Sequence, residues 1–312
     1  MKAVRCCDKA VHVVDVPAPS GEGVVVNVRS SGICGSDIHM VGLGFELPGT
    51  LGHEVAGTLR DGTPVALEPL APCGHCDQCV EGAYGLCRLG GGMLHGVGLD
   101  GGMAEQIIVP ESAIVPLPHG VSASDACLVE PLAVAAHGIR KLNLKPSSRV
   151  AVIGAGAVGL AAVAVLTPYV NTVHIAARHD AQKEASERLG AALDPEGEYD
   201  VVIECAGTSA ALAQAARLCR PGGTLLLLAT YWDGVELPAM EVSMKCLTIV
   251  ASFLYSRQGL VRDVDMAAGL LAQRPDLPDI FITHRFPLDA AVEAFATAAD
   301  RQAGAIKVVL EP

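Results

Sequence analysis

The sequence predicts an α/β fold that contains a doubly wound parallel sheet, and three observations support this prediction. Between residues 149 and 228, short apolar strands alternate with helical segments, which is typical of a parallel sheet covered by helices on both faces. Before Lys145, β-branched runs and turns rich in Gly and Pro predict a mostly β region. The length of 312 residues agrees with two domains of ordinary size.

The elements of the first part follow from β-branched runs and from the Gly and Pro residues between them. Strands are expected at 24–29, as a pair within 55–67, and near 107–109. Gly-rich loops occupy 73–102. Residues 122–142 predict a helix, which Pro131 is expected to break.

The rest of the chain follows a regular alternation and then returns to β patterns. Strands are expected at 150–153, 172–176, 201–204 and 224–228, with helices at 157–166, 181–189 and 209–219 between them. After a helical pattern at 260–273, the chain ends in strand, helix and strand patterns at 282–286, 288–299 and 305–310. This order predicts a second, β-rich contribution from the end of the chain.

The composition excludes several classes of protein. With 51% hydrophobic and 18% charged residues, the chain is not intrinsically disordered. A net charge of −12 and an aromatic content of 4% argue against a nucleic-acid partner. The start of the chain shows no signal-peptide pattern, and glycines and Pro168 within the uncharged stretch 150–170 favour a strand, a turn and a helix over a membrane span. We therefore expect a cytoplasmic protein with no membrane partner.

Four cysteines within a short loop, Cys73, Cys76, Cys79 and Cys87, form the most specific motif. Four thiolates provide the tetrahedral shell of a structural zinc site, which leaves no open position for catalysis. An iron–sulfur cluster is an alternative, but the ferredoxin pattern continues with a shorter spacing and Cys-Pro, whereas Arg88 follows Cys87 here. Four unrelated free thiols are the remaining interpretation.

Residues 154–159 read G-A-G-A-V-G, the pattern G-x-G-x-x-G, between a predicted strand and an apolar helix. In this context Gly154 makes a tight turn, Gly156 lets the backbone approach a pyrophosphate, and Gly159 lets helix and strand pack closely. The pyrophosphate would rest on the helix N-terminus at Ala157 and Val158. A Gly-rich turn without a ligand is the alternative interpretation.

The end of the second strand of this predicted sheet indicates which nicotinamide cofactor binds. An acidic residue there would bind the ribose 2′-hydroxyl of NAD, but the strand ends at Ala176 and is followed by Arg178 and His179. A positive charge at this place favours the 2′-phosphate of NADP. Asp180 leaves NAD as the alternative if the strand ends later, and Arg178 as an ordinary solvated charge is the other interpretation.

A third group of residues offers ligands for a catalytic zinc. Cys34 and His53 supply a thiolate and an imidazole, and either Glu54 or Glu130 supplies a carboxylate. Three protein ligands with one open position are typical of a catalytic zinc site. Taken singly, Cys34 is also explained as a small buried side chain, His53 as a core histidine, and Glu130 as a surface acid.

Together these motifs resemble those of the zinc-dependent medium-chain alcohol dehydrogenases. The family's order is matched by C-G-S-D-x-H at 34–39, G-H-E-x-x-G at 52–57, the four cysteines, E-P-L-A at 130–133, G-x-G-x-x-G at 154–159 and the closing segment 286–309. The E-P-L-A segment is similar to that of the polyol (sorbitol) and threonine dehydrogenase branch, which carries a glutamate where liver-type enzymes carry a cysteine ligand.

The resemblance implies which residues bind metal. Cys34 and His53 match two ligands of the catalytic zinc. Glu54 matches a residue that ligates the metal or stands directly behind it, and Glu130 matches the third or water-mediated ligand of the branch. The structural zinc lobe is matched by Cys73, Cys76, Cys79 and Cys87.

The resemblance also implies a path for the proton. Ser36 matches the hydroxyl that bonds the substrate oxygen, and His39 matches the outer end of a proton relay to solvent. Asp37 matches the carboxylate that orients the histidine ligand, an arrangement that fixes the tautomer of the imidazole.

As a whole, the resemblance implies a Rossmann domain at 139–274 inserted in a β-rich, GroES-like catalytic domain made of 1–138 and 275–312. The implied activity is reversible hydride transfer between a secondary alcohol, such as a polyol or cyclitol, and a nicotinamide cofactor, in a homodimer or homotetramer. Two alternatives are a zinc-independent NADPH reductase of enones or quinones, whose members usually lack these ligands, and a non-catalytic zinc-binding module.

Departures from the family pattern concern the rim of the site and the cofactor. The segment between His53 and Cys73 is shorter than usual, which indicates a shortened hairpin. Gly35 stands where some relatives carry a basic residue that reaches the cofactor phosphates. Ala177 stands where the family's NAD-selecting aspartate is usual.

Overall fold

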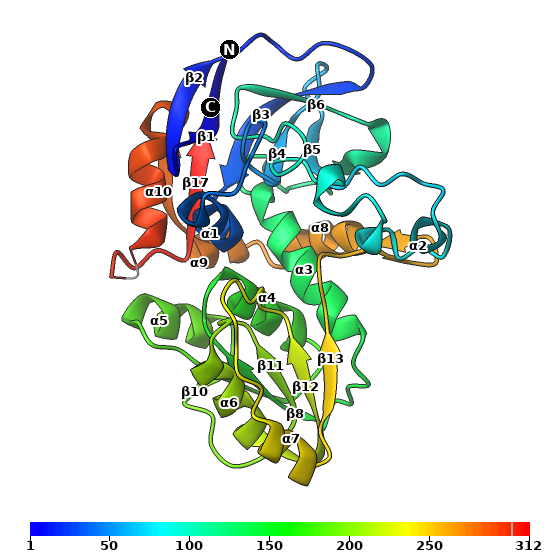
Figure 1. Cartoon of the computed structure of the whole chain (residues 1–312), viewed down its shortest axis with the longest axis vertical. Coiled ribbons are helices and arrows are strands. Elements are labelled where there is room, and N and C mark those ends of the chain that lie inside the picture. The colour runs from blue at the N-terminus through cyan, green and yellow to red at the C-terminus, as the bar shows by residue number, and fades with distance from the viewer. Residues whose placement is uncertain (301) are drawn as a thin grey trace. The chain divides into compact units, whose positions relative to one another are not determined.

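The computed structural model describes residues 1–300 and 302–312 and divides the chain into two compact units (Figure 1). The first unit consists of Met1–Glu130 and Ser256–Pro312, and the second of Pro131–Tyr255. The first division falls within helix α3 (Val129–Arg140). The domain boundaries expected from the sequence, after residues 138 and 274, stay a prediction.

The first unit is built mainly from strands. These are β1 (Lys2–Cys7), β2 (Ala10–Asp15), β3 (Val24–Gly32), β4 (Glu54–Thr58), β5 (Pro64–Leu67), β6 (Gln106–Val109), β7 (Ile114–Pro116), β14 (Arg257–Gln258), β15 (Val261–Arg262), β16 (Ile282–Pro287) and β17 (Lys307–Glu311). Its helices are α1 (Gly35–Leu43), α2 (Asp77–Val80), α8 (Asp263–Gln273), α9 (Leu277–Phe281) and α10 (Ala291–Ala299). Short 3₁₀ turns lie at Tyr84–Leu86, Gly90–Met93, Glu111–Ala113, Ala126–Leu128 and Leu288–Ala290.

The central sheet of this unit has the strand order β16-β17-β3-β4-β5-β7, and β6 also pairs with β3. Val26 and Val28 of β3 are buried in a cluster with Val55, Val65 and Ile107 from the neighbouring strands. The burial of alternate residues explains why these β-branched runs form strands around one core. The predicted β-rich region is confirmed.

Three features, two in the first unit and one at its boundary with the second, differ from the expectations or were not foreseen. β1 and β2 form an antiparallel hairpin, and α1 follows β3, although the sequence analysis assigned no element to either place. Pro131 does not break α3, because it lies in the first turn of the helix, where a missing N–H donor needs no partner.

The second unit alternates strands and helices. Its strands are β8 (Arg149–Ile153), β9 (Thr172–Ala176), β10 (Ala192–Leu193), β11 (Tyr199–Glu204), β12 (Cys219–Leu227) and β13 (Thr248–Ala251). Its helices, besides most of α3, are α4 (Ala157–Leu166), α5 (Asp180–Arg188), α6 (Ser209–Leu218) and α7 (Ala239–Met244).

The six strands form one parallel sheet in the order β10-β9-β8-β11-β12-β13. Numbered within the unit, this order is 3-2-1-4-5-6, that of a doubly wound dinucleotide-binding fold. Ala151, Ile153, Val202 and Leu225 are buried between the sheet and its helices. The predicted α/β class with a doubly wound sheet is confirmed.

The uncharged stretch 150–170 is divided between β8 and the short helix α4. Within the described residues 1–300 and 302–312, no helix is both long and apolar enough to cross a membrane.

Candidate active site and cofactor cradle

Three strands of the first unit bring candidate metal ligands together. β3 ends at Gly32, shortly before Cys34, and pairs with β4 so that Gly32 lies opposite Glu54. His53 immediately precedes β4. β17 pairs with the same end of β3, with Val309 opposite Gly32. This register places Cys34 beside the start of β4. It also places Cys34 and the start of β4 beside β17.

Cys34, His53 and Glu54 form a group whose ligand atoms all lie within 4.8 Å of one another. His53 and Glu54 are buried, and Cys34 is partly exposed. A thiolate, an imidazole and a carboxylate suit zinc, and three protein ligands leave an open coordination position. The residues present therefore fit a catalytic metal. In the part of the chain that the structure describes, Glu130 is buried but is not a member of this group.

Two side chains of α1 lie against the ring of His53. Asp37 Oδ1 lies 3.3 Å from His53 Nδ1, and Asp37 Oδ2 accepts a 2.9 Å hydrogen bond from the backbone N–H of Cys34. Ser36 Oγ lies 3.4 Å from the other ring nitrogen, Nε2. Burial lowers the pKa of His53, but the charges of Asp37 and Cys34 outweigh burial and raise that pKa well above its ordinary value. Asp37 thus orients the ring so that Nε2 lies beside the hydroxyl of Ser36.

His39 lies on the exposed side of α1, and its Nδ1 lies 2.6 Å from the carbonyl oxygen of Gly35. Ser36 and His39 are three residues apart on the helix, a spacing that puts two side chains on one face. The helix therefore connects the neighbourhood of His53 to the surface.

Lys307, at the start of β17, is a site residue that the sequence analysis missed. Its side chain is 2% exposed, and its Nζ donates to both carboxylate oxygens of Glu54, at 2.7 and 2.6 Å, and to the carbonyl oxygen of Ile33 at 3.1 Å. Burial lowers the pKa of Lys307, but the charges of Glu54 and Cys34 outweigh burial and raise that pKa. A single lysine inside the apolar run I-K-V-V-L was the available signal, because a buried ammonium group needs an anionic partner.

The four cysteines predicted to bind a structural zinc also lie together, with their sulfur atoms all within 4.8 Å of one another. Cys79 Sγ lies 3.5 Å from Cys76 Sγ and 3.9 Å from Cys73 Sγ. Backbone N–H groups of Arg88 and Cys79 lower the pKa of Cys76 to about 6, which favours the thiolate that a metal binds. The donor set fits a closed tetrahedral zinc site.

The loop that carries these cysteines is anchored to a distant segment of the same unit. The hydroxyl of Tyr84 donates to Glu68 at 2.5 Å, and Arg262 Nη1 donates to the other oxygen of Glu68 at 3.2 Å. The backbone N–H of Gly85 donates to Ser256 Oγ at 3.2 Å. These contacts fix the four-cysteine loop against the segment that begins at Ser256.

In the second unit, the glycine motif forms the turn between β8 and α4. Gly154 has a φ of +104°, which favours glycine, and its N–H donates to the carbonyl oxygen of Ala176. A Cβ at Gly159 would lie 1.8 Å from the carbonyl oxygen of Gly154, so helix and strand pack too closely for a side chain there. A Cβ at Gly156 would meet nothing within 4 Å. The space over Gly156, at the N-terminus of α4 beside Ala157, fits a dinucleotide pyrophosphate.

Glu204, at the carboxyl end of β11, holds the loop opposite this turn and was not singled out in the sequence. Its Oε1 accepts hydrogen bonds from the backbone N–H groups of Ala206 and Gly207, at 2.8 and 2.9 Å. Its Oε2 accepts a 2.7 Å hydrogen bond from the hydroxyl of Tyr231. β8 and β11 are neighbours at the point where the strand order reverses, which is where such sheets bind ligands.

Gly156 and Gly159 give a matched pair of predictions. Gly159→Ala is expected to destabilise the fold by at least about 1–3 kcal/mol, because its Cβ would overlap a backbone oxygen. Gly156→Ala should leave the melting temperature unchanged, because its Cβ has room, and weaken NADPH binding about 10- to 100-fold by filling the pyrophosphate space. Thermal unfolding and a fluorescence titration with NADPH measure the two effects. Equal losses of affinity and stability in both variants would contradict the assignment of Gly156.

The structure shows where the predicted cofactor-selecting residues lie. β9 ends at Ala176, and Arg178 follows it with an exposed side chain. Asp180 is the first residue of α5 and forms an ion pair of 3.1 Å with Lys183. Arg178 is therefore closer along the chain to the strand end than Asp180 is.

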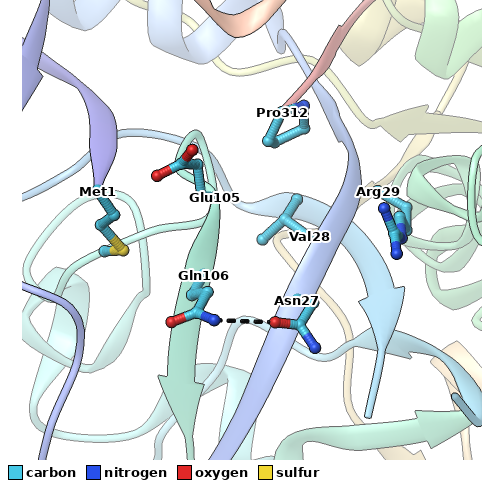
Figure 2. A pocket seen from close by; sticks show the side chains of 7 residues that line it. All are labelled: Met1, Asn27, Val28, Arg29, Glu105, Gln106 and Pro312. Carbon is cyan, nitrogen blue, oxygen red and sulfur yellow. Dashed lines mark hydrogen bonds between the residues drawn. The ribbon is translucent and has the colours of Figure 1, made fainter. Parts of the chain in front are cut away.

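The first unit also contains a pocket that is lined by other residues (Figure 2). It is lined by Met1, Asn27, Val28, Arg29, Glu105, Gln106 and Pro312. Gln106 Nε2 donates to Asn27 Oδ1 at 2.9 Å across it. None of the predicted site residues contributes to this pocket.

Comparisons with known proteins bear on the class of the chain. Residues 20–119 match the model of the alcohol dehydrogenase GroES-like domain, and residues 123–311 match that of the glucose dehydrogenase C-terminus. D-xylulose reductase A of Aspergillus oryzae is 30% identical over 92% of this chain and 91% of its own, and L-galactonate-5-dehydrogenase of Escherichia coli is 29% identical over 90% and 89%. A crystal structure of a zinc-binding dehydrogenase from Sinorhizobium meliloti, bound to NADP, is 30% identical, with a TM-score of 0.86 over 100% of this chain and 99% of that chain.

The fold, the buried ligand group and these matches define an oxidoreductase with a GroES-like and a dinucleotide-binding part. The chain belongs to the zinc-dependent medium-chain alcohol dehydrogenase family. The family resemblance and the enzyme class expected from the sequence are confirmed.

Proposed function

We propose that the protein catalyses reversible hydride transfer between a secondary alcohol group of a polyol or similar polar alcohol and NADP. The observation that carries this proposal is the buried group of Cys34, His53 and Glu54, a three-ligand donor set beside the hydroxyl of Ser36. The names of two relatives, D-xylulose reductase and L-galactonate-5-dehydrogenase, support a hydroxyl-rich substrate.

In this proposal the first unit holds the metal and positions the alcohol. Cys34, His53 and Glu54 would hold a zinc ion, which would supply Lewis-acid polarisation of the substrate oxygen. Asp37 orients His53 through Nδ1. Lys307 offsets the charge of Glu54, so the site keeps more positive charge than a thiolate and a free carboxylate would leave. Glu130 lies outside this group, so of its two possible roles, direct ligand or water-mediated ligand, we assign it the water-mediated one.

The proton leaves through side chains of α1. Ser36 would accept the hydroxyl proton of the substrate while it passes its own hydroxyl proton on towards His39, because its Oγ lies beside the ring nitrogen Nε2 of His53. His39 transfers the proton to solvent from the exposed side of the same helix. The turn of Gly154, Gly156 and Gly159, with the start of α4 at Ala157 and Val158, would hold the pyrophosphate of a nicotinamide cofactor, which would supply the hydride acceptor when bound.

The preference for NADP rests on Arg178. Arg178 is exposed and lies two residues after the end of β9, while the nearby carboxylate of Asp180 is paired with Lys183. Arg178→Ala is expected to weaken NADPH binding about 10- to 100-fold, the value of a charge-assisted hydrogen bond, and to change NADH binding much less. Fluorescence titrations with both cofactors measure this difference. Tighter NADH binding by the unmodified protein would assign the selecting role to Asp180 instead.

A second zinc is proposed at Cys73, Cys76, Cys79 and Cys87, with a structural role. Elemental analysis should find about two zinc ions per chain, one in the closed four-cysteine site and one in the open site of Cys34, His53 and Glu54. In the same preparation, complete removal of metal should abolish NADP-dependent oxidation of polyols. Unchanged turnover in the metal-free protein would count against the proposed function.

The protein is further proposed to be a homodimer or homotetramer. β13 is an edge strand of the six-stranded sheet, and its residues Thr248, Ile249 and Ala251 are exposed. An exposed apolar strand edge is a template for pairing with another chain. Sedimentation of a monomer at micromolar concentration would contradict this. The cytoplasmic location stays a prediction from the sequence.

A further inference from the structure

His95 is a buried titratable residue that neither the motifs nor the proposed mechanism uses. Its side chain is 7% exposed and lies in the loop that follows the four cysteines. His95 Nδ1 lies 2.7 Å from the carbonyl oxygen of Asp100. A carbonyl oxygen only accepts hydrogen bonds, so Nδ1 carries the proton.

The second ring nitrogen of His95, Nε2, is buried and has no hydrogen-bond partner among the described residues. Burial lowers the pKa of His95 below its ordinary value, against the opposing effect of the Asp100 carbonyl, so the ring is neutral. Nε2 therefore carries an unused lone pair, directed away from Asp100. Buried acceptors of this kind are normally satisfied by protein, water or a ligand.

The backbone places His95 beside the segment that leads into the metal ligands. Gly101 and Met103 donate to the carbonyl oxygens of Thr50 and Leu51, at 2.7 and 2.8 Å. Gly96, next to His95, packs so tightly on Gly52 that a Cβ there would lie 2.7 Å from the Gly52 carbonyl carbon. Gly52 immediately precedes His53. All these contacts lie within the first unit.

We propose that His95 Nε2 accepts a hydrogen bond from a second hydroxyl group of the substrate, so that His95 selects alcohols that carry a neighbouring hydroxyl. This inference rests on the proposed function and adds a specificity residue to it. A neutral imidazole nitrogen accepts from a hydroxyl but offers nothing to a methyl group. A site with such an acceptor discriminates against an analogue that leaves it unpaired.

Two substitutions at His95 separate its two nitrogens. His95→Asn retains a side-chain N–H near the Nδ1 position for the Asp100 carbonyl and removes Nε2. His95→Gln places an acceptor oxygen near the Nε2 position. His119→Asn, at an exposed histidine, is the surface control.

The probes are 2,3-butanediol and 2-butanol, which differ by one hydroxyl group, with NADP as the oxidant. The unmodified zinc enzyme should favour the diol in kcat/KM, and His95→Asn should lose about 10- to 100-fold of that preference. Its kcat/KM for 2-butanol should change less than about threefold, because the lost bond concerns only the second hydroxyl. His95→Gln should retain more of the preference than His95→Asn. Equal losses for both alcohols, or no loss for either, would overturn the assignment.

A second measurement separates this inference from the proposed function. If the unmodified protein oxidises neither alcohol with either nicotinamide, the proposed function fails. Nitrogen-15 NMR of histidine-labelled protein then tests His95 without turnover, with His95→Asn assigning its signals. We expect protonated Nδ1, unprotonated Nε2, and a shift of the Nε2 signal with 2,3-butanediol but not with 2-butanol. A protonated Nε2, or one that does not respond to the diol, as a trapped water would give, overturns the inference.

Discussion

The Cys34→Ser variant is expected to lose at least about 1,000-fold of kcat/KM while it keeps its fold, because a zinc Lewis acid contributes several kcal/mol to the transition state. Cys34 supplies the only thiolate of the buried ligand group. A serine hydroxyl is protonated at neutral pH and is a poor zinc ligand. Cys34 is partly exposed and lies at the end of a strand rather than inside a core cluster, so the substitution creates no large cavity.

The measurement combines steady-state kinetics, zinc content and circular dichroism. If both proposed sites hold zinc, the zinc content should fall from about two ions to about one, because the four cysteines form a separate group that Cys34→Ser does not touch. His53→Ala should behave in the same way. Cys7→Ser is the matched control, since its exposed thiol belongs to neither ligand group. Full activity in Cys34→Ser with one zinc lost would show that the metal at this site does not take part in the reaction.

The Lys307→Met variant is expected to lose about 3–5 kcal/mol of stability, the usual cost of removing one partner from a buried ion pair. Glu54 would remain 1% exposed, without the ammonium group that now contacts both of its oxygens. The carboxylate packs against Gly32, where a Cβ would stand 2.1 Å from Oε2. Thermal unfolding of the metal-free protein measures the loss.

Two further variants identify the cause of that loss. Lys307→Met combined with Glu54→Gln should regain most of the stability, because no unpaired charge is left buried. Lys2→Met breaks an exposed ion pair with Asp289 and should leave the stability nearly unchanged, because solvent screens that pair. A Lys307→Met variant no less stable than Lys2→Met would refute the importance of the buried pair.

The pH dependence of this pair has a defined sign. The folded protein raises the pKa of Lys307 above 10.5, so the folded state holds its proton more tightly than the unfolded state. The stabilisation is complete below pH 10.5 and is lost as the pH rises through the folded pKa. In strongly alkaline solution, the free energy of unfolding of the unmodified protein should therefore fall as Lys307 loses its proton. The Lys307→Met variant should not show this fall.

Local patterns in the sequence were sufficient for most elements and for two of the candidate sites. The glycine motif lies within six consecutive residues, and the four cysteines lie within one loop, so their spacing alone brings the groups together. The alternation of strands and helices predicted the doubly wound sheet because the periodicity of a buried strand or helix is a local property. Pro131 shows the limit of this reasoning, since its effect depends on where α3 begins.

Contacts between distant segments could not be predicted in this way. Lys307 and Glu54 are 253 residues apart, and only the pairing of β17 with β3 and of β3 with β4 makes them neighbours. The sequence left Glu54 and Glu130 as equal candidates, and it is the strand register that puts Glu54 beside Cys34 and His53. His95 carries no local motif, and only the packing of its neighbour Gly96 on Gly52 brings it close to the metal ligands in the chain.

By itself, the sequence determined the fold class, the family and most of the candidate ligands, because spacing within a few turns of chain defines those motifs. Only the tertiary structure decided which carboxylate lies beside Cys34 and His53, which lysine balances its charge, and that Nε2 of His95 is buried without a hydrogen-bond partner among the described residues. The physical reason is that burial and hydrogen-bond pairing depend on the register between strands far apart in the chain, which no local pattern encodes.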